Sequence, residues 1–121
     1  MEIIIHKEVY AIAKTNKPLI GSFAIVNDEK KITSIIKQSE INKHKKYIIK
    51  IEKDWIILTF NTRLPFELVG FLAKISHALA EEKISIFVIS AYSTDHILIK
   101  KKNLARAMKK LKALGFKFIK K

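Results

Sequence analysis

The sequence contains four histidines and no cysteine, which limits the metal sites and strong nucleophiles that it could build. The histidines, at positions 6, 44, 77 and 96, do not form the His-Glu-x-x-His spacing of a zinc-binding helix, and no Gly-x-Ser-x-Gly turn is present. The three glycines, at positions 21, 70 and 115, stand alone, so no glycine-rich loop can hold a phosphate. Without cysteine, a disulfide framework and a thiolate metal site are also excluded. We therefore expect a protein that is not an enzyme and that uses no cofactor.

Gly70 is a residue whose position needs an explanation. It falls near the beginning of a segment with the pattern of a good helix, where glycine costs about 1 kcal/mol relative to alanine. One explanation is close packing of that helix on a sheet. The other is that the missing side chain lets a ligand approach the helix N-terminus, where free N–H groups favour a carboxylate.

Asp95 is the only acidic residue after Glu82. One interpretation is turn chemistry, in which the aspartate bonds to its own backbone. The other is that a carboxylate surrounded by lysines stays ionised and binds an ammonium or guanidinium group. A helix N-terminus and a lone carboxylate would together suit a free amino acid.

The second half of the chain predicts two helices and four strands. The apolar spacing of Leu68, Leu72, Ile75 and Leu79 is typical of a helix with one face on a sheet. The predicted elements are a strand at 55–60, a helix from Pro65 to about Glu82, strands at 84–92 and 96–100, a helix capped by Asn103 and ended by Gly115, and a strand at 116–119. This β-α-β-β-α-β order is that of the ferredoxin-like unit, so we expect a four-stranded antiparallel sheet with both helices on one face.

The first half predicts three or four short strands, at 9–13, 23–26, 33–37 and 47–51, with 3–5 as a further short partner. These strands could form a reduced copy of the same unit. The charged segment Glu52–Asp54 separates the halves and is predicted to be a turn. We therefore expect an α+β fold with two units, residues 1–54 and residues 55–121.

Five segments of the second half match a known family in residue type and spacing. They are Trp55–Leu58, Leu64–Phe66, Val69–Leu72, Ile84–Ser90 and Tyr92–Ile99. With them, residues 55–118 resemble a small-molecule-binding ACT domain, in the form found in short bacterial tandem-ACT proteins and in cytosolic arginine sensors. In the first half, Tyr10–Ala13 and Ser34–Ile36 resemble strands of the partner ACT-like unit. The resemblance implies a tandem of two ferredoxin-like units.

The same resemblance implies a regulatory, non-enzymatic module with its ligand between two ACT units. Carried over residue by residue, it points to Gly70, Tyr92, Asp95 and the pair Ser34-Ile35 as ligand-binding residues. Ala91 and His96 stand where the arginine sensors have threonine and tyrosine, so arginine itself is not implied. We expect a free amino acid as ligand and a homodimer as the assembly.

The charge of the chain suggests one alternative function. Of 24 basic residues, 22 are lysine, the net charge is +13, and residues 83–121 hold ten lysines and Arg106 against Asp95. A lysine-rich C-terminal surface could bind nucleic acid, which is the alternative to the sensor. Arginine is the residue that reads phosphates and guanine edges bidentately, so a surplus of lysine is a weaker indication, and nucleic acid is not the expected partner. No apolar run is long enough to span a bilayer and the first residues do not form a signal peptide, so we expect a cytoplasmic protein.

Overall fold

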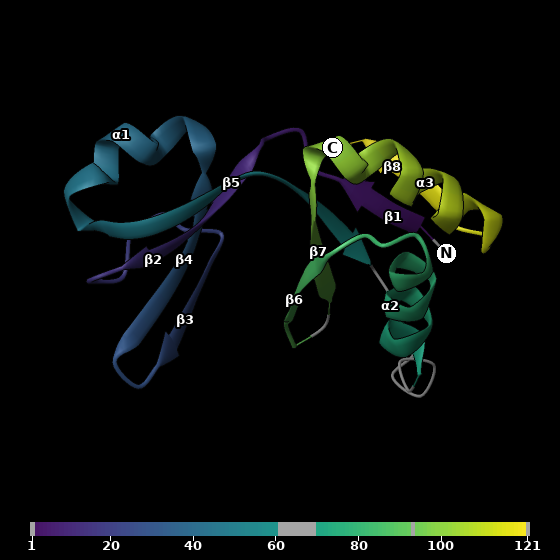
Figure 1. Cartoon of the computed structure of the whole chain (residues 1–121), viewed down its shortest axis with the longest axis horizontal. Helices are drawn as coiled ribbons and strands as arrows, with labels where there is room; N and C mark the ends of the chain where they lie inside the picture. The colour runs from purple at the N-terminus through teal and green to yellow at the C-terminus, as the bar shows by residue number, and fades with distance from the viewer. Residues whose placement is uncertain (1, 61–69, 93, 121) are drawn as a thin grey trace. The chain divides into compact units, whose positions relative to one another are not determined.

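The computed structural model describes residues 2–60, 70–92 and 94–120 (Figure 1). It divides into a smaller unit, Glu8–Trp55, and a larger unit, Met1–Lys7 with Ile56–Lys121. The strands are β1 (Glu2–Ile5), β2 (Tyr10–Thr15), β3 (Ala24–Asp28), β4 (Lys31–Lys37), β5 (Ile48–Phe60), β6 (Ile86–Ser90), β7 (Asp95–Lys100) and β8 (Lys117–Lys120). The α-helices are α1 (Ile41–His44), α2 (Phe71–Glu81) and α3 (Leu104–Ala113).

The smaller unit is an antiparallel sheet with the strand order β3-β4-β2-β5, in which β5 takes part with its first residues. This is the strand order of a ferredoxin-like unit. Residues 16–23 connect β2 to β3 without a helix, where such a unit would have its first helix. Leu19 from this connection packs on Ala11 and Ile36, and Ile41 of α1 packs on the same cluster. One face of the sheet is thus covered by a loop and a single-turn helix.

The larger unit has the strand order β8-β1-β5-β7-β6. The N-terminal strand β1 lies between β5 and β8, antiparallel to β5 and parallel to β8. The predicted four-stranded, fully antiparallel sheet is therefore wrong in two respects, since a fifth strand is inserted and one pair is parallel. From β5 onward the element order among the described residues is still β-α-β-β-α-β. The inserted strand buries Ile3 completely and Ile5 almost completely, which supplies the driving force for its position.

The boundary between the units also differs in detail from the predicted division at residues 54 and 55. Residues 2–5 belong to the larger unit, and β5 runs through the segment Glu52–Asp54, which was predicted to be a turn. The pairing of β2 with β5 shifts register there, and Asp54 takes a positive φ of 68°, so the segment is a bulge. The Gln38 side chain stabilises this bulge, because its amide donates to Asp54 Oδ1 at 2.9 Å and its oxygen accepts from the Asp54 N–H at 2.7 Å.

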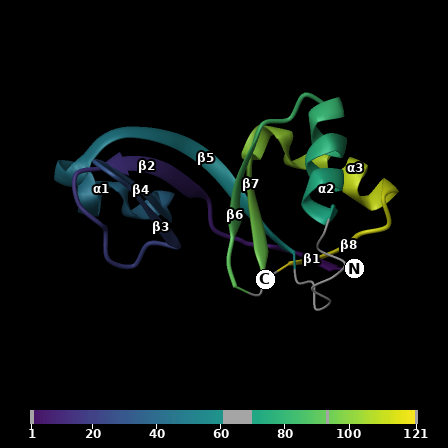
Figure 2. The same cartoon turned by 90° about the horizontal axis from the view of Figure 1, so that it is seen from below.

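Both helices of the larger unit lie on one side of β1 and β8 (Figure 2). Phe60 of β5, Phe71 of α2 and Phe116, which follows α3, form a cluster of edge-to-face rings with centroids 5.4–5.9 Å apart. Phe60 is fully buried. The cluster connects the sheet to both helices. Because alternate residues of a strand share a face, Leu58 and Phe60 lie on the face of β5 that is turned toward the helices.

The two helices end in the same way. In α3, Gly115 has a φ of 98° and donates to the Lys112 carbonyl, while Phe116 donates to Leu111, which confirms Gly115 as the predicted end of the helix. In α2, Lys83 occupies the corresponding place with a φ of 57° and donates to Ala80. A side chain at such a φ costs more than glycine.

Lys83→Gly is therefore expected to stabilise the protein by about 0.5–1 kcal/mol. Urea unfolding of the variant and the parent measures the difference. Lys109→Gly is the matched control, because it places a glycine inside α3 and should destabilise by about 1 kcal/mol. A loss of stability in both variants would contradict the assignment of Lys83 to the left-handed end of α2.

Candidate functional site

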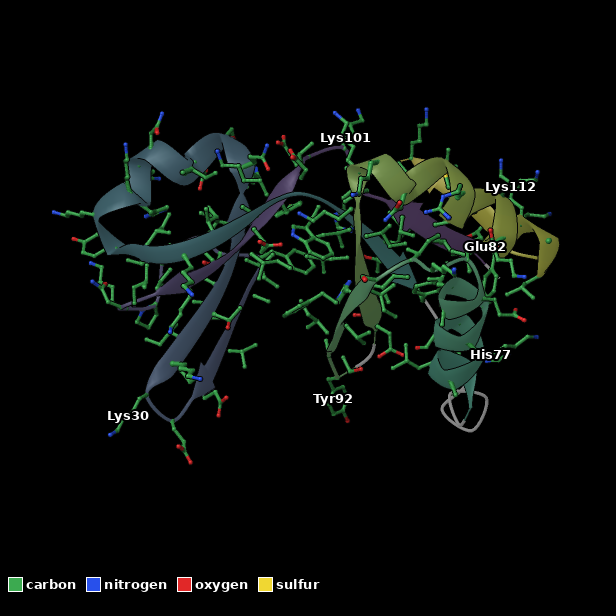
Figure 3. All side chains as sticks on the ribbon, in the orientation of Figure 1. Lys30, His77, Glu82, Tyr92, Lys101 and Lys112 are labelled. Atoms are coloured by element: carbon green, nitrogen blue, oxygen red, sulfur yellow. The ribbon has the colours of Figure 1, made fainter. Side chains whose placement is uncertain are left out.

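Two of the predicted ligand-binding residues, Tyr92 and Asp95, lie at one hairpin turn. The turn connects β6 to β7, Ser90 pairs with Asp95, and the Ala91 N–H donates to the Thr94 carbonyl at 2.8 Å. Tyr92 is fully exposed and points away from the hairpin (Figure 3). The hairpin therefore presents an aromatic ring and a carboxylate within four residues.

The Asp95 carboxylate is half-buried and has no hydrogen bond or ion pair to any side chain or backbone group in the described part of the chain. The turn interpretation required a bond from this carboxylate to the local backbone, and among residues 70–92 and 94–120 the turn is closed by backbone groups instead. A half-buried carboxylate without a partner can accept hydrogen bonds from a cationic group.

Gly70 immediately precedes α2 and has a φ of 82°. It does not lie inside the helix, because the described helix begins at Phe71, and the predicted segment from Pro65 to residue 69 lies outside the described residues. A Cβ atom on Gly70 would meet nothing within 4 Å, so close packing does not explain the glycine. Its backbone conformation does, since an L-residue there costs about 1–2 kcal/mol.

Ser34 and Ile35 lie on β4 of the smaller unit, and both are fully buried. The Ser34 hydroxyl is 3.1 Å from Thr15 Oγ1, and Thr15 Oγ1 in turn donates to the Lys17 carbonyl. The hydroxyl therefore already has a partner within its own unit. Of the five predicted residues, Tyr92 and Asp95 share a turn, Gly70 belongs to the same unit, and Ser34 and Ile35 belong to the other.

A chain of polar side chains that the sequence did not predict crosses the sheet of the larger unit. Thr59 Oγ1 lies 2.8 Å from His6 Nε2 and 2.8 Å from His96 Nδ1, and His96 Nε2 lies 3.1 Å from Thr94 Oγ1. Thr59 faces away from the helices, because its neighbours in β5 face them. The signal in the sequence was Thr59, a polar residue inside an otherwise apolar strand.

Burial lowers the pKa of His96, and the nearby Asp95 carboxylate opposes part of this shift. The neutral imidazole donates from one ring nitrogen and accepts at the other, which satisfies the hydroxyls of Thr59 and Thr94 together. Because the pKa of His96 is lower in the folded protein than in the unfolded chain, the unfolded chain binds the proton first as the pH falls. The stability that neutral His96 contributes is present above the ordinary value of 6.5 and is lost as the pH falls below it.

We accordingly expect the melting temperature of the protein to fall more steeply than that of a His96→Asn variant as the pH is lowered from 7. Melting temperatures measured across this range test the difference in slope, which does not depend on the lost hydrogen bonds of the variant. His77→Asn serves as the control because His77 is an exposed helix residue, 78% accessible and 3.8 Å from Glu81. Parallel slopes for parent and His96→Asn would contradict the assignment.

The cationic side chains around α3 are partly engaged within the larger unit. Arg106 donates to the Glu82 carbonyl at 2.7 Å and to Asn103 Oδ1 at 2.9 Å, and Lys110 lies 3.4 Å from Glu81. Asn103 is the N-cap residue of α3, as predicted, but its side chain makes no capping bond. Its amide oxygen binds Arg106 instead. These contacts connect α2 to α3. Arg106, one of the two arginines of the sequence, therefore has a structural role that requires no nucleic acid.

Within residues 2–60, 70–92 and 94–120, no group of three or more histidine, aspartate or glutamate side chains could hold a metal ion. None of the described helices is both long and apolar enough to cross a membrane. The described residues thus offer the Asp95 carboxylate, the exposed phenol ring of Tyr92 and the N-terminus of α2 beside Gly70.

The fold of this chain is similar to several solved structures. A protein of Agobacterium tumefaciens matches with a TM-score of 0.83 at 20% identity, over 99% of this chain and 92% of that one. A protein of unknown function from Vibrio cholerae, described as a possible transport protein, matches with a TM-score of 0.74 at 22% identity, over 90% and 85% of the chains. The regulatory subunit of aspartate kinase from Thermus flavus matches with a TM-score of 0.71 at 9% identity, over 93% and 96%. These likenesses establish the fold.

A comparison with curated proteins finds no match. The family model of the ACT domain matches residues 50–113, which is more than half of the chain and includes the hairpin with Tyr92 and Asp95. The α+β architecture, with a mixed sheet and helices on one face of the larger unit, agrees with this match. The chain belongs to the ACT domain family.

Proposed function

We propose that this protein is a non-enzymatic regulatory module that binds a free amino acid. The Asp95 carboxylate binds the cationic group of the ligand, and the N–H groups at the beginning of α2, beside Gly70, bind its carboxylate. Tyr92 covers the ligand with its ring. The observation that carries the proposal is the Asp95 carboxylate, which has no hydrogen bond or ion pair in the described part of the chain and lies three residues from an exposed aromatic side chain.

Membership of the ACT family supports this proposal, since ACT domains are regulatory modules that bind small ligands, often amino acids. A regulatory subunit of aspartate kinase shares the fold.

Purified protein screened by thermal shift against the common amino acids tests the function. A ligand at 100 times its dissociation constant is expected to stabilise the protein by about 2.7 kcal/mol. Absence of any shift at millimolar concentrations would contradict the proposed function.

With the amino acid found in this screen, Asp95→Asn is expected to weaken binding about tenfold or more, since a hydrogen bond to a charged group contributes about 1.5–3 kcal/mol. Glu82→Gln removes the same charge from another half-buried position of the same unit and should leave the affinity unchanged. Titration calorimetry of the three proteins gives the comparison. Equal affinities for Asp95→Asn and the parent would place the ligand elsewhere.

The participation of Ser34 and Ile35 remains a prediction. Because the Ser34 hydroxyl bonds to Thr15, Ser34→Ala would reduce affinity only if the ligand competes for that hydroxyl. We propose a homodimer as the regulatory assembly, with pairing at the free edges of β3 or β6, where Val26 and Val88 are exposed. Sizing of the protein with and without its ligand distinguishes a sensor whose assembly responds to ligand from a purely structural dimerisation module.

A further inference from the structure

A pocket of about 270 Å³ lies at one end of the sheet of the larger unit, away from the hairpin turn between β6 and β7. It is lined by Ile5, His6, Lys7, Ile56, Leu104 and Lys120. The pocket exists because β1 is inserted beside β8. These two strands are parallel, with Ile5 opposite Lys120, so their carboxyl ends meet at the same edge.

The N-terminus of α3 lies at this edge as well. The helix leads into β8 through a tight turn and therefore runs back along it, which brings Leu104, its first residue, to the end of β8 that carries Lys120. Crevices outside the carboxyl ends of parallel strands, beside helix N-termini, are where open α/β sheets bind anionic ligands. The first turn of α3 holds no acidic residue, and no side chain caps it.

The lining divides into an apolar floor and a cationic rim. Ile5 and Ile56 are buried, 8% and 5% exposed, and Leu104 is half-buried beside them. Lys7 and Lys120 are exposed at the rim, and neither has an ion pair in the part of the chain that the structure describes. None of the described residues that line the pocket is acidic. A ligand that matches this lining carries a negative charge at one end and hydrocarbon at the other.

We propose that this pocket is a second binding site, separate from Gly70, Tyr92 and Asp95, that takes a small carboxylate with a short aliphatic group. The carboxylate lies between the ammonium groups of Lys7 and Lys120, at the positive end of the α3 dipole, where the Leu104 N–H itself donates to the Lys101 carbonyl. The aliphatic group lies on Ile5, Ile56 and Leu104. A pocket of this volume is at the small end of ligand sites, which limits the ligand to the size of a branched short-chain acid.

The experiment is an NMR titration of the full chain, with isovalerate as probe and the backbone amide of Leu104 as reporter. Inorganic phosphate has the charge without the hydrocarbon, and isoamylamine has the same hydrocarbon with the opposite charge. Isovalerate is expected to shift the Leu104 amide saturably at millimolar concentrations, while phosphate binds more weakly and isoamylamine does not compete. Lys120→Gln should weaken isovalerate binding about fivefold, as expected for the loss of one exposed charge contact.

Lys117→Gln is the matched control, because it makes the same change at an exposed position on β8 three residues away. An unchanged affinity for this variant, together with the loss in Lys120→Gln, supports the site. Three results would overturn it: no saturable shift at Leu104, equal weakening in both variants, or phosphate binding as tightly as isovalerate. The site is independent of Asp95, so Asp95→Asn should bind isovalerate as the parent does.

Discussion

Phe60→Ala is expected to destabilise the larger unit by about 3–5 kcal/mol, the range measured when a buried phenylalanine is truncated. Phe60 is fully buried, and its ring contacts Phe71 and Phe116 edge to face, with centroids 5.4 and 5.9 Å away. Truncation removes both contacts and leaves a cavity between the sheet and the helices. Because domains are stable by only about 5–15 kcal/mol, the variant should lose much of its resistance to urea.

Urea unfolding, followed by circular dichroism, measures this loss. Tyr92→Ala removes an aromatic side chain of similar size from a fully exposed position, so without ligand it should change stability by no more than about 0.5 kcal/mol. If the two variants lost similar stability, Phe60 would not be the connection between β5 and the helices.

The second half of the fold could be predicted from sequence because its signals are local. The apolar run before Phe60 has the length of a buried strand, and Ile75 and Leu79 lie on the buried side of α2, as their spacing predicted. The position of β1 could not be predicted, since the three isoleucines at 3–5 indicate a strand but contain no information about its neighbours in the sheet. Pairing of β1 with β8 joins the two ends of the chain, and such long-range pairing depends on which edges the rest of the fold leaves open.

The candidate site also contains residues that could be found from the sequence and residues that could not. Asp95 could be found from the sequence because a single acid in a basic segment is visible there, whereas the chain through His6, Thr59 and His96 requires knowledge of the sheet order. These residues are far apart in sequence and meet only because β1 and β7 both lie next to β5. Gly70 was singled out correctly as unusual, but its reason is a positive φ before α2, which helix periodicity does not reveal.

Ile3→Ala is expected to destabilise the larger unit by about 2–5 kcal/mol, because Ile3 is fully buried in β1, between β5 and β8. Hydrogen exchange of the backbone amides shows where the loss occurs. If β1 completes the ACT unit, the amides of β5 from Ile57 to Phe60 and those of β8 should lose protection, and those of β2 and β4 should keep theirs.

The matched control is Ile20→Ala, which makes the same truncation at a side chain that is 91% exposed and should leave both units unchanged. Loss of protection in β2 and β4 instead of β8 would mean that residues 2–5 stabilise the smaller unit, as the division at residue 54 implied. The expected result would also mean that an ACT unit begun at Trp55 lacks a central strand. A fragment cut there would then expose the edges of β5 and β8 that β1 pairs in the whole chain, so ligand tests on this protein need residues 2–7.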